Sequence, residues 1–355
     1  MKKVNFEGQK IYNGIDVHQK QWNVSIYTKD SYHKTFQQPP DSEVLKNYLD
    51  KHFPGGIYYS VYEAGNSGFS PHRHLEGVGI QNIVVHPGDV PTTDKERKQK
   101  RDARDSRKLG RSLRNGDLEA IHIPSLALQQ DREIVRYRCN KILPKLTRVK
   151  NQIKSYVSLY GHRYWAEFGS GSYWSKKFVA WLEQLNFTHA SGRQALDLLL
   201  EELKWLQGQL KRTDRLIVEL SRQDRYRDQV VLLRSVPGVG LLVAMVILTE
   251  IGQMSRFSSL DHLCHYVGLV PNVYASDDKE RVGRQTRRGN SLMRRMLLQS
   301  AWHAIRLDPA LLQKYEQLTQ RMNGNKAIIR IEKKLLNRIR RVLLSGIPYE
   351  LGVLR

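Results

Sequence analysis

Apolar and polar residues alternate along the first part of the chain with a period of two, which predicts β-strands. In residues 10–18, Ile11, Ile15 and Val17 alternate with polar or small residues, and residues 21–28 (QWNVSIYT) repeat the alternation. Further strands are predicted at residues 31–36, 56–63 and 80–85, and helices at 41–52 and 71–77. Three consecutive strands followed by strands that alternate with helices predict a mixed α/β sheet.

From about residue 125 the apolar positions follow a helical period instead. Residues 126–160 form a basic amphipathic stretch that Pro144 is expected to kink, and the Gly- and Ser-rich residues 167–175 predict a turn. In the next long helix, apolar residues hold the a and d positions of a heptad register, with Thr213 as the interruption: Leu196, Leu199, Leu203, Leu206, Leu210, Ile217 and Leu220. This coiled-coil pattern fits either an intramolecular helical hairpin or a seam between subunits.

A third region begins near residue 228. It contains SVPGVG (235–240), an apolar helix, a polar stretch at 274–290, an Arg-rich helix and a basic helical tail. We therefore predict three domains: an α/β domain at 1–124, a helical coiled-coil region at 125–227, and a helical C-terminal domain at 228–355. The predicted fold class is α/β plus all-α.

Charge narrows the possible partners of this chain. Its 355 residues include 58 Lys or Arg and 35 Asp or Glu, which gives a formal net charge of +23. The electrostatic field of such a charge attracts polyanions, of which nucleic acid is the commonest and an anionic membrane surface is the alternative.

The longest apolar run, residues 241–248, is too short to span a bilayer, and the start of the chain has no signal-peptide pattern. Two distant cysteines, Cys139 and Cys264, favour a reducing cytoplasm. Because no apolar run is long enough to span a bilayer, we expect no membrane partner.

Four acidic residues have a pattern typical of phosphoryl-transfer chemistry. Asp16 and Glu63 each come near the end of a predicted strand, and Asp102 and Asp105 share one face of a helix. Carboxylates that converge from such positions can bind two divalent cations, which stabilise the attacking and leaving oxygens. The alternative is that Asp102 and Asp105 only neutralise a basic helix through Arg pairs.

Basic residues surround the second pair of acids. Residues 95–114 contain ten Lys or Arg and three acids, and four of the cations are expected to hold a phosphate backbone: Arg101, Arg104, Arg107 and Lys108. In SVPGVG, Gly238 and Gly240 could free backbone N–H groups for a phosphate, as in half of a helix-hairpin-helix, although a tight turn between helices uses the same residues.

Two sets of sequence blocks resemble a known family. The blocks YNGIDVHQKQWNVSIYT, VYEAG and KRDARDSRKLGR resemble the RuvC-like, RNase H-fold domain of DEDD insertion-sequence transposases, described as bridge-RNA-guided recombinases. The block GLVPNVYASDDKERVGRQTRRGNSLMRRMLLQSAW is similar to the C-terminal transposase domain of that family. The resemblance maps the four catalytic and metal-binding acids onto Asp16, Glu63, Asp102 and Asp105, with Mg²⁺ as the cofactor and Mn²⁺ as a substitute.

The resemblance also implies that Ser276, in a short polar loop, is a nucleophile that forms a covalent link to DNA. A group of basic residues follows it and could hold the scissile phosphate: Lys279, Arg281, Arg284, Arg287 and Arg288. Arg294 and Arg295, on the next helix, are either DNA contacts or part of a solvated face. The family commonly has glycine directly after the serine, whereas here Asp277 and Asp278 follow.

Three functions are compatible with these features. The first is a recombinase that cuts and rejoins donor and target DNA at the nucleoid, guided by a structured noncoding RNA and working as a dimer or tetramer. The second is a hydrolytic nuclease of the Holliday-junction-resolvase type, which uses the same carboxylates with water. The third is a nucleic-acid-binding protein without catalytic activity.

Overall fold

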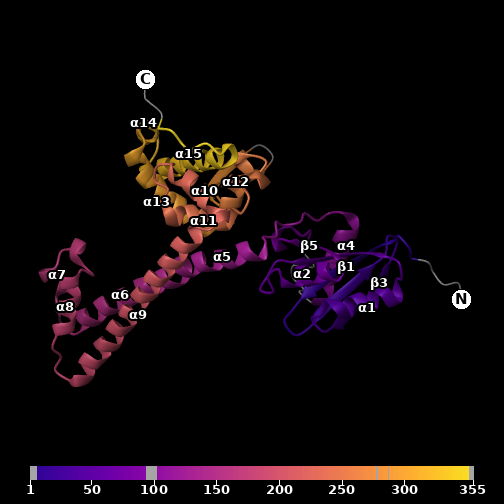
Figure 1. The fold of residues 1–355 in the computed structure, drawn as a ribbon, viewed down its shortest axis with the longest axis horizontal. Helices are drawn as coiled ribbons and strands as arrows, with labels where there is room; N and C mark the ends of the chain where they lie inside the picture. Colours follow the sequence, from indigo (N-terminus) through magenta and orange to yellow (C-terminus); the bar gives the residue numbers. More distant parts are fainter. Residues whose placement is uncertain (1–5, 93–101, 277–278, 287, 352–355) are drawn as a thin grey trace. The chain divides into compact units, whose positions relative to one another are not determined.

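The structure is a computed structural model that describes residues 6–92, 102–276, 279–286 and 288–351, with the backbone alone for 102, 103 and 272–285. The chain divides into two compact units, Met1–Ile123 and Pro124–Arg355 (Figure 1). The finer division of the second unit into a helical region and a C-terminal transposase domain stays a prediction.

The N-terminal unit is built on a mixed five-stranded sheet. Its strands are β1 (Lys10–Val17), β2 (Trp22–Tyr27), β3 (Tyr32–Gln38), β4 (Ile57–Glu63) and β5 (Gln81–Val85), in the order β3-β2-β1-β4-β5. The first three strands pair antiparallel, whereas β4 pairs parallel with both β1 and β5. The mixed sheet predicted from the alternation is therefore confirmed.

Helices cover both faces of this sheet. On one face, α1 (Ser42–His52) and α2 (Ser70–Gly77) contribute Leu45, Leu49 and Leu75 to a core that includes Ile11 and Ile15 of β1. A short 3₁₀ turn, Pro87–Asp89, follows β5. On the other face lies α4 (Asp102–Asn115), and its Leu109 packs with Val61, Val85 and Val90. Because side chains alternate along a strand, Tyr12, Gly14 and Asp16 face α4.

Helix α4 crosses β1 without side chains between the two backbones. A Cβ on Gly14 would overlap the carbonyl oxygen of Ser106 and the amide nitrogen of Gly110. A Cβ on Gly110 would lie 2.9 Å from the ring of Tyr27 on β2. Hydrogen bonds reinforce the contact, since the Ser25 and Ser106 hydroxyls are 2.8 Å apart and the Tyr27 hydroxyl donates to the Arg107 carbonyl. The two glycines therefore fix the distance between α4 and the sheet.

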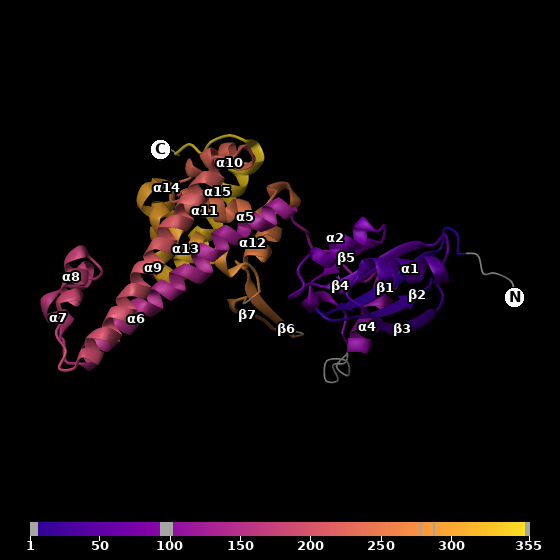
Figure 2. The ribbon, with the colours of Figure 1, turned by 60° about the horizontal axis from the view of Figure 1, so that its bottom comes forward.

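The second unit is largely helical. Its helices are α5 (Leu126–Arg136), α6 (Leu143–Leu159), α7 (Tyr164–Glu167), α8 (Lys176–Gln184), α9 (Ala190–Ser221), α10 (Asp224–Arg234), α11 (Leu241–Ile251), α12 (Leu260–Val267), α13 (Ser291–Leu307), α14 (Pro309–Thr319) and α15 (Gly324–Ser345), with short 3₁₀ turns at Ser170–Ser172 and Met254–Arg256. Within this unit, α6 and α9 form a long arm with α7 and α8 at its end (Figures 1 and 2). None of the helices in the described ranges is both long and apolar enough to cross a membrane.

The heptad residues of α9 pack inside the chain. Leu196, Leu203 and Leu206 are buried in one core with Val149 and Ile153 of α6. Leu199 and Leu210 are partly buried against the same core. The intramolecular hairpin is thus present in the structure, while a seam between subunits remains a prediction.

The irregularity expected at Pro144 takes a different form. A π-helical segment, Tyr137–Ile142, joins α5 to α6, and Pro144 lies in the first turn of α6. Proline has no N–H to donate to the preceding turn, and the wider π-helical turn just before it accommodates this loss. The break in regular α-helix therefore precedes the proline.

A strand hairpin corrects the expectation of a polar loop around Ser276. The two strands, β6 (Pro271–Ser276) and β7 (Lys279–Gln285), pair antiparallel between α12 and α13. Figure 2 shows the hairpin extending from the helices of the second unit. Val273 and Val282, which pair with each other, and Tyr274 have high β-propensity, and this signal was outweighed by the abundant charges of the stretch.

We predict that Gly14→Ala lowers the free energy of unfolding of the N-terminal unit by about 3 kcal/mol, because the added methyl group displaces α4. The matched control is Gly77→Ala. Gly77 is the last residue of α2, and a Cβ added there meets nothing within 4 Å. This substitution should change the free energy of unfolding by no more than about 0.5 kcal/mol. Urea unfolding followed by circular dichroism measures both. Equal stability of the two variants would contradict the tight crossing.

Candidate active site

Three of the predicted acids lie toward the same face of the N-terminal sheet. β1 and β4 are parallel neighbours, and Gly14 is opposite Val61. Asp16 comes two residues after Gly14, and Glu63 comes two residues after Val61. Because side chains alternate along a strand, both acids point to the same face of the sheet as Gly14 and Val61, which is the face that α4 covers. Asp105 lies on α4 itself. The tertiary structure therefore directs acids from two strand ends and one helix to a common face.

Lys108 connects two of these acids. Its Nζ lies 3.2 Å from Glu63 Oε1 and 3.9 Å from Asp105 Oδ1, and its side chain is only 8% exposed. A buried ammonium group requires nearby negative charge, because burial without a partner costs several kcal/mol. Glu63 and Asp105 are thus held around a single positive charge. Lys108 was predicted to hold a phosphate backbone, and the structure places it between carboxylates instead of on the basic surface.

Asp16 has a different neighbour. The ring nitrogen Nε2 of His18 lies 3.1 Å from Asp16 Oδ2, and about half of the histidine side chain is exposed. The two residues are on the same side of the strand, as the period of two predicts. The ring nitrogen of His18 is thus within hydrogen-bonding distance of this carboxylate.

The fourth acid, Asp102, begins α4, and its side chain lies outside the described part of the structure. Its position three residues before Asp105 places both residues on one side of the helix. Among the side chains that are described, no group of three or more acids, histidines or cysteines is close enough to hold a metal ion. A complete four-acid cluster therefore stays a prediction.

Ser276 is the last residue of β6 and pairs with Lys279, the first residue of β7. The backbone at Ser276 is thus fixed by strand pairing directly before the connection. Lys279, Arg281 and Arg284 all lie on β7, while Arg287 is outside the described residues.

The sequence matches two transposase family models. Residues 13–162 match a transposase model of the DEDD, IS110 type, and residues 230–316 match the transposase IS116/IS110/IS902 family. The first match contains Asp16, Glu63, Asp102 and Asp105, and the second contains Ser276. The chain belongs to the DEDD insertion-sequence transposases. Its mixed sheet with helices on both faces fits the RNase H-like fold expected for that family.

Individual transposases are also similar to this chain. The candidate transposase y4qE of Sinorhizobium fredii is 30% identical over 69% of this chain and 58% of its own length. The transposase for insertion sequence element IS1533 of Leptospira borgpetersenii is 27% identical over 68% of this chain and 70% of its own. The transposase for element IS1111A of Coxiella burnetii is 24% identical over 69% and 65%. The alignment thus spans less than two thirds of the Sinorhizobium relative.

The basic residues of α4 in this transposase differ in exposure. Arg107 is exposed, and its Nε donates to the Thr35 hydroxyl at 3.0 Å while its guanidinium lies over the Tyr32 ring. Arg104 is half-buried, and Arg101 lies outside the described residues. Arg107 is therefore the described cation of this group best placed to meet a phosphate.

The SVPGVG segment of the transposase forms a tight turn between α10 and α11. Val239 N donates to Val236 O at 3.0 Å, and Gly238 has a φ of +82°, as in a type II turn with proline and glycine at its centre. A Cβ on Gly238 would overlap the carbonyl oxygen of Ser300 on α13. Gly240 precedes α11, and an added Cβ there would meet nothing. The turn and its packing explain Gly238, and Gly240 is the position open to a ligand.

The two arginines of α13 that were predicted as possible DNA contacts bind other parts of the protein itself. Arg294 Nη1 donates to the carbonyls of Gly268 and Thr286 at 3.1 and 2.9 Å, and Arg295 Nη2 donates to Asn140 Oδ1 at 2.9 Å. Arg288, just before this helix, is exposed. Both arginines of α13 therefore form hydrogen bonds within the protein. The sequence alone suggested only DNA contact or exposure to solvent for them.

One charged residue near the hairpin was missed altogether. Glu250 is an acid within the otherwise apolar helix LLVAMVILTEI and is 1% exposed. A single acid in an apolar run of this kind is itself a signal, because a buried carboxylate must have hydrogen-bonding or charged partners.

We predict that Lys108→Met lowers the free energy of unfolding of the N-terminal unit by about 1–2 kcal/mol, because Glu63 and Asp105 lose the cation between them. Millimolar Mg²⁺ should raise the melting temperature of this variant more than that of the unaltered protein. The control is Lys51→Met, which removes an exposed cation of α1. An equal Mg²⁺ effect in all three proteins would show that these carboxylates do not attract the ion.

Proposed function

We propose that this transposase cuts and rejoins DNA strands with its N-terminal carboxylates and Ser276. The observation that carries the proposal is the common orientation of Asp16, Glu63 and Asp105, with two of these acids around one buried cation. Such an arrangement supports phosphoryl transfer, in which the protein must concentrate negative oxygen ligands beside the reacting phosphate.

The proposed cofactor is Mg²⁺, with Mn²⁺ as a substitute, held by Asp16, Glu63, Asp102 and Asp105. Carboxylate oxygens are the ligands that this hard cation prefers, and Glu63 and Asp105 already compensate one positive charge. When bound, the ion would lower the pKa of the attacking hydroxyl and stabilise the developing charge. Lys108 would then give up a carboxylate contact, and its ammonium could turn toward a phosphate oxygen.

In the proposed reaction, Ser276 Oγ attacks the phosphorus of the scissile phosphodiester. A bond forms between Oγ and phosphorus as the hydroxyl loses its proton, the bond from phosphorus to the leaving nucleotide oxygen breaks, and that oxygen takes up one proton, so that no net proton is gained or lost. The phosphoserine link retains the energy of the diester, so a hydroxyl of another DNA strand can displace the serine and rejoin the chain. Lys279, Arg281 and Arg284 follow on β7 and would balance the charge of the phosphate.

Nucleic acid recognition in this proposal relies on charge and on base pairing. The net charge of +23 supports contacts to many phosphates, which position a nucleic acid without reading its sequence. A structured noncoding RNA would read donor and target DNA by base pairing, as in other RNA-guided systems. We place this activity at the nucleoid, in the cytoplasm, where both DNA partners lie.

The assembly proposed for the reaction is a dimer or tetramer, because two DNA ends must be held together. The heptad helix α9 is a candidate interface: Leu198 and Trp205 are 68% and 56% exposed on it, although its a and d residues pack within the chain, on α6 in the first part of the helix and in the core of the helical unit at Ile217 and Leu220. The proposed division is a catalytic domain at 1–124, a coiled-coil region at 125–227 and a transposase domain at 228–355. Gly240 would supply the phosphate contact of a helix-hairpin-helix.

We predict that the protein forms a denaturation-resistant adduct with labelled DNA that carries the ends of its element, and that Ser276→Ala abolishes it. Asp16→Asn and removal of divalent metal should also abolish the adduct, because the serine then loses activation. Ser255→Ala, which changes an exposed serine of the same unit, should leave adduct formation unchanged. Cleavage that continues in Ser276→Ala without any adduct would favour the hydrolytic nuclease. DNA binding without cleavage by the unaltered protein, with metal present, would favour the non-enzymatic protein.

We also predict that a discrete RNA copurifies with the protein from cells that carry the flanking DNA of its gene. Sequencing of the bound RNA should recover a transcript of that flanking DNA. The control is expression from the coding sequence alone, which should yield only bulk cellular RNA bound through charge. Identical RNA populations in the two preparations would contradict the guide-RNA proposal and leave the cleavage proposal intact.

A further inference from the structure

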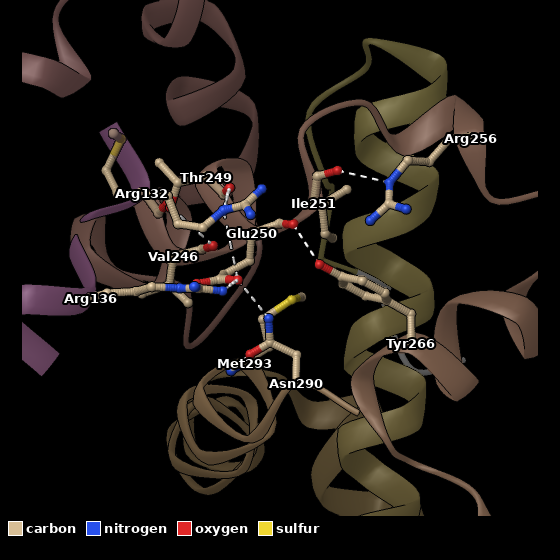
Figure 3. A network of polar contacts seen from close by, with 11 residues as sticks. Arg132, Arg136, Val246, Thr249, Glu250, Ile251, Arg256, Tyr266, Asn290 and Met293 are labelled. Atoms are coloured by element: carbon tan, nitrogen blue, oxygen red, sulfur yellow. Dashed lines mark hydrogen bonds and ion pairs between the residues drawn. The ribbon is translucent and has the colours of Figure 1, made fainter. Parts of the chain in front are cut away.

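Glu250 is a buried carboxylate that connects distant segments of the second unit. Arg136 of α5 donates from Nε to Oε1 at 2.6 Å and from Nη2 to Oε2 at 2.7 Å. Asn290 donates from Nδ2 to Oε2 at 2.7 Å, and Arg132 Nε lies 3.9 Å from the same oxygen. Figure 3 shows these groups converging on the carboxylate. Helix α5 and the residue that precedes α13 are thus joined through one side chain.

Asn290 uses both ends of its amide in this position. Its Oδ1 accepts from Met293 N at 3.0 Å and so caps α13, while its Nδ2 donates to Glu250. Its backbone N donates to the carbonyl of Tyr266 at 2.9 Å, and the Tyr266 hydroxyl donates to the Glu250 carbonyl at 2.7 Å. A serine or aspartate at 290 could cap the helix, but neither has the amide N–H₂ donor that reaches Glu250.

These contacts surround the base of the β6–β7 hairpin. The segment before β6 and the segment after β7 touch at Gly268 and Gly289, where φ is +84° and +107°. A Cβ on Gly289 would lie 2.6 Å from Gly268 N. Arg294 Nη1 bonds to a carbonyl on each segment, those of Gly268 and Thr286. Both ends of the hairpin are therefore fixed to each other, and Asn290 fixes them to Glu250.

We propose that Glu250 is a positioning residue that fixes the hairpin bearing Ser276 relative to helix α5. A buried ion pair contributes little net stability compared with apolar packing, but it defines geometry closely. The anchoring follows from the contacts of Glu250 and Asn290; its consequence for strand cleavage rests on the proposed role of Ser276. Loss of the Glu250–Asn290 bond would leave the helix cap intact and free the hairpin to change its angle.

The test uses Asn290→Ser, which keeps a capping oxygen and removes the donor to Glu250. The matched control is Asn323→Ser, which makes the same change at the N-cap of α15. Asn290→Asp is the second variant: it keeps the cap and places a carboxylate against Glu250. Melting temperatures show which of the variants remain folded, and DNA affinity is measured for each.

Hairpin motion is measured with a nitroxide on Ser276→Cys in the full-length protein. The native Cys139 and Cys264 are 3% and 0% exposed, so the label is directed to position 276. We expect a motionally restricted spectrum in the parent and in Asn323→Ser, and a faster component in Asn290→Ser and Asn290→Asp. Unchanged spectra in both Asn290 variants would overturn the anchoring.

Adduct formation at saturating DNA is measured with Ser276 in place. We expect a loss of about 10²-fold in the Asn290 variants, because small misplacements of a reacting group carry costs of this order, with DNA affinity unchanged. Normal adduct formation with a mobile hairpin would overturn the link to cleavage. If the Asn290 variants lose adduct formation while the hairpin stays immobile, a change in hairpin position is not the cause of the loss, and the positioning role would be overturned. Absence of an adduct in the parent would refute the proposed function alone, because the spectra still report on the anchoring.

Discussion

The close crossing of α4 over β1 is the constraint on which the N-terminal site depends. Gly14 and Gly110 let the two backbones touch, so the helix lies directly on the sheet. The position of each residue along α4 then decides what it meets. Asp105 and Lys108, one turn apart, lie toward the strand end that carries Glu63. A larger residue at either glycine would lift the helix and move its acids away from those of the strands.

Charge compensation has the same function in both units. In the first, Lys108 holds Glu63 and Asp105 around one ammonium group. In the second, Glu250 holds Arg136 and Asn290 around one carboxylate. Neither arrangement is an efficient source of stability, since burying charge cancels most of the attraction gained. Each instead fixes the place of an element that the proposed reaction uses, the acids in one case and, as we propose, the serine hairpin in the other.

Sequence patterns predicted the positions of the candidate acids where those positions reflect local geometry. Alternation along β1 and β4 was enough to assign Asp16 and Glu63 to strand ends, and the i, i+3 spacing placed Asp102 and Asp105 on one helix face. The assignment of Ser276 came from family resemblance, and its strand pairing with Lys279 was not foreseen. Arg294 shows why: an arginine on a helix looks the same in sequence whether its partner is a phosphate or the carbonyls of Gly268 and Thr286.

By itself, the sequence determined the mixed sheet, the change to helices near residue 125, the basic character and the family, because periodicity, charge and motif are properties of neighbouring residues. Only the tertiary structure decided that Lys108 is buried between two acids and that Glu250 joins α5 to the base of the hairpin. Glu250 is 114 residues from Arg136 and 40 from Asn290. Contacts over such separations depend on how whole elements pack, and no local pattern of residue types encodes them.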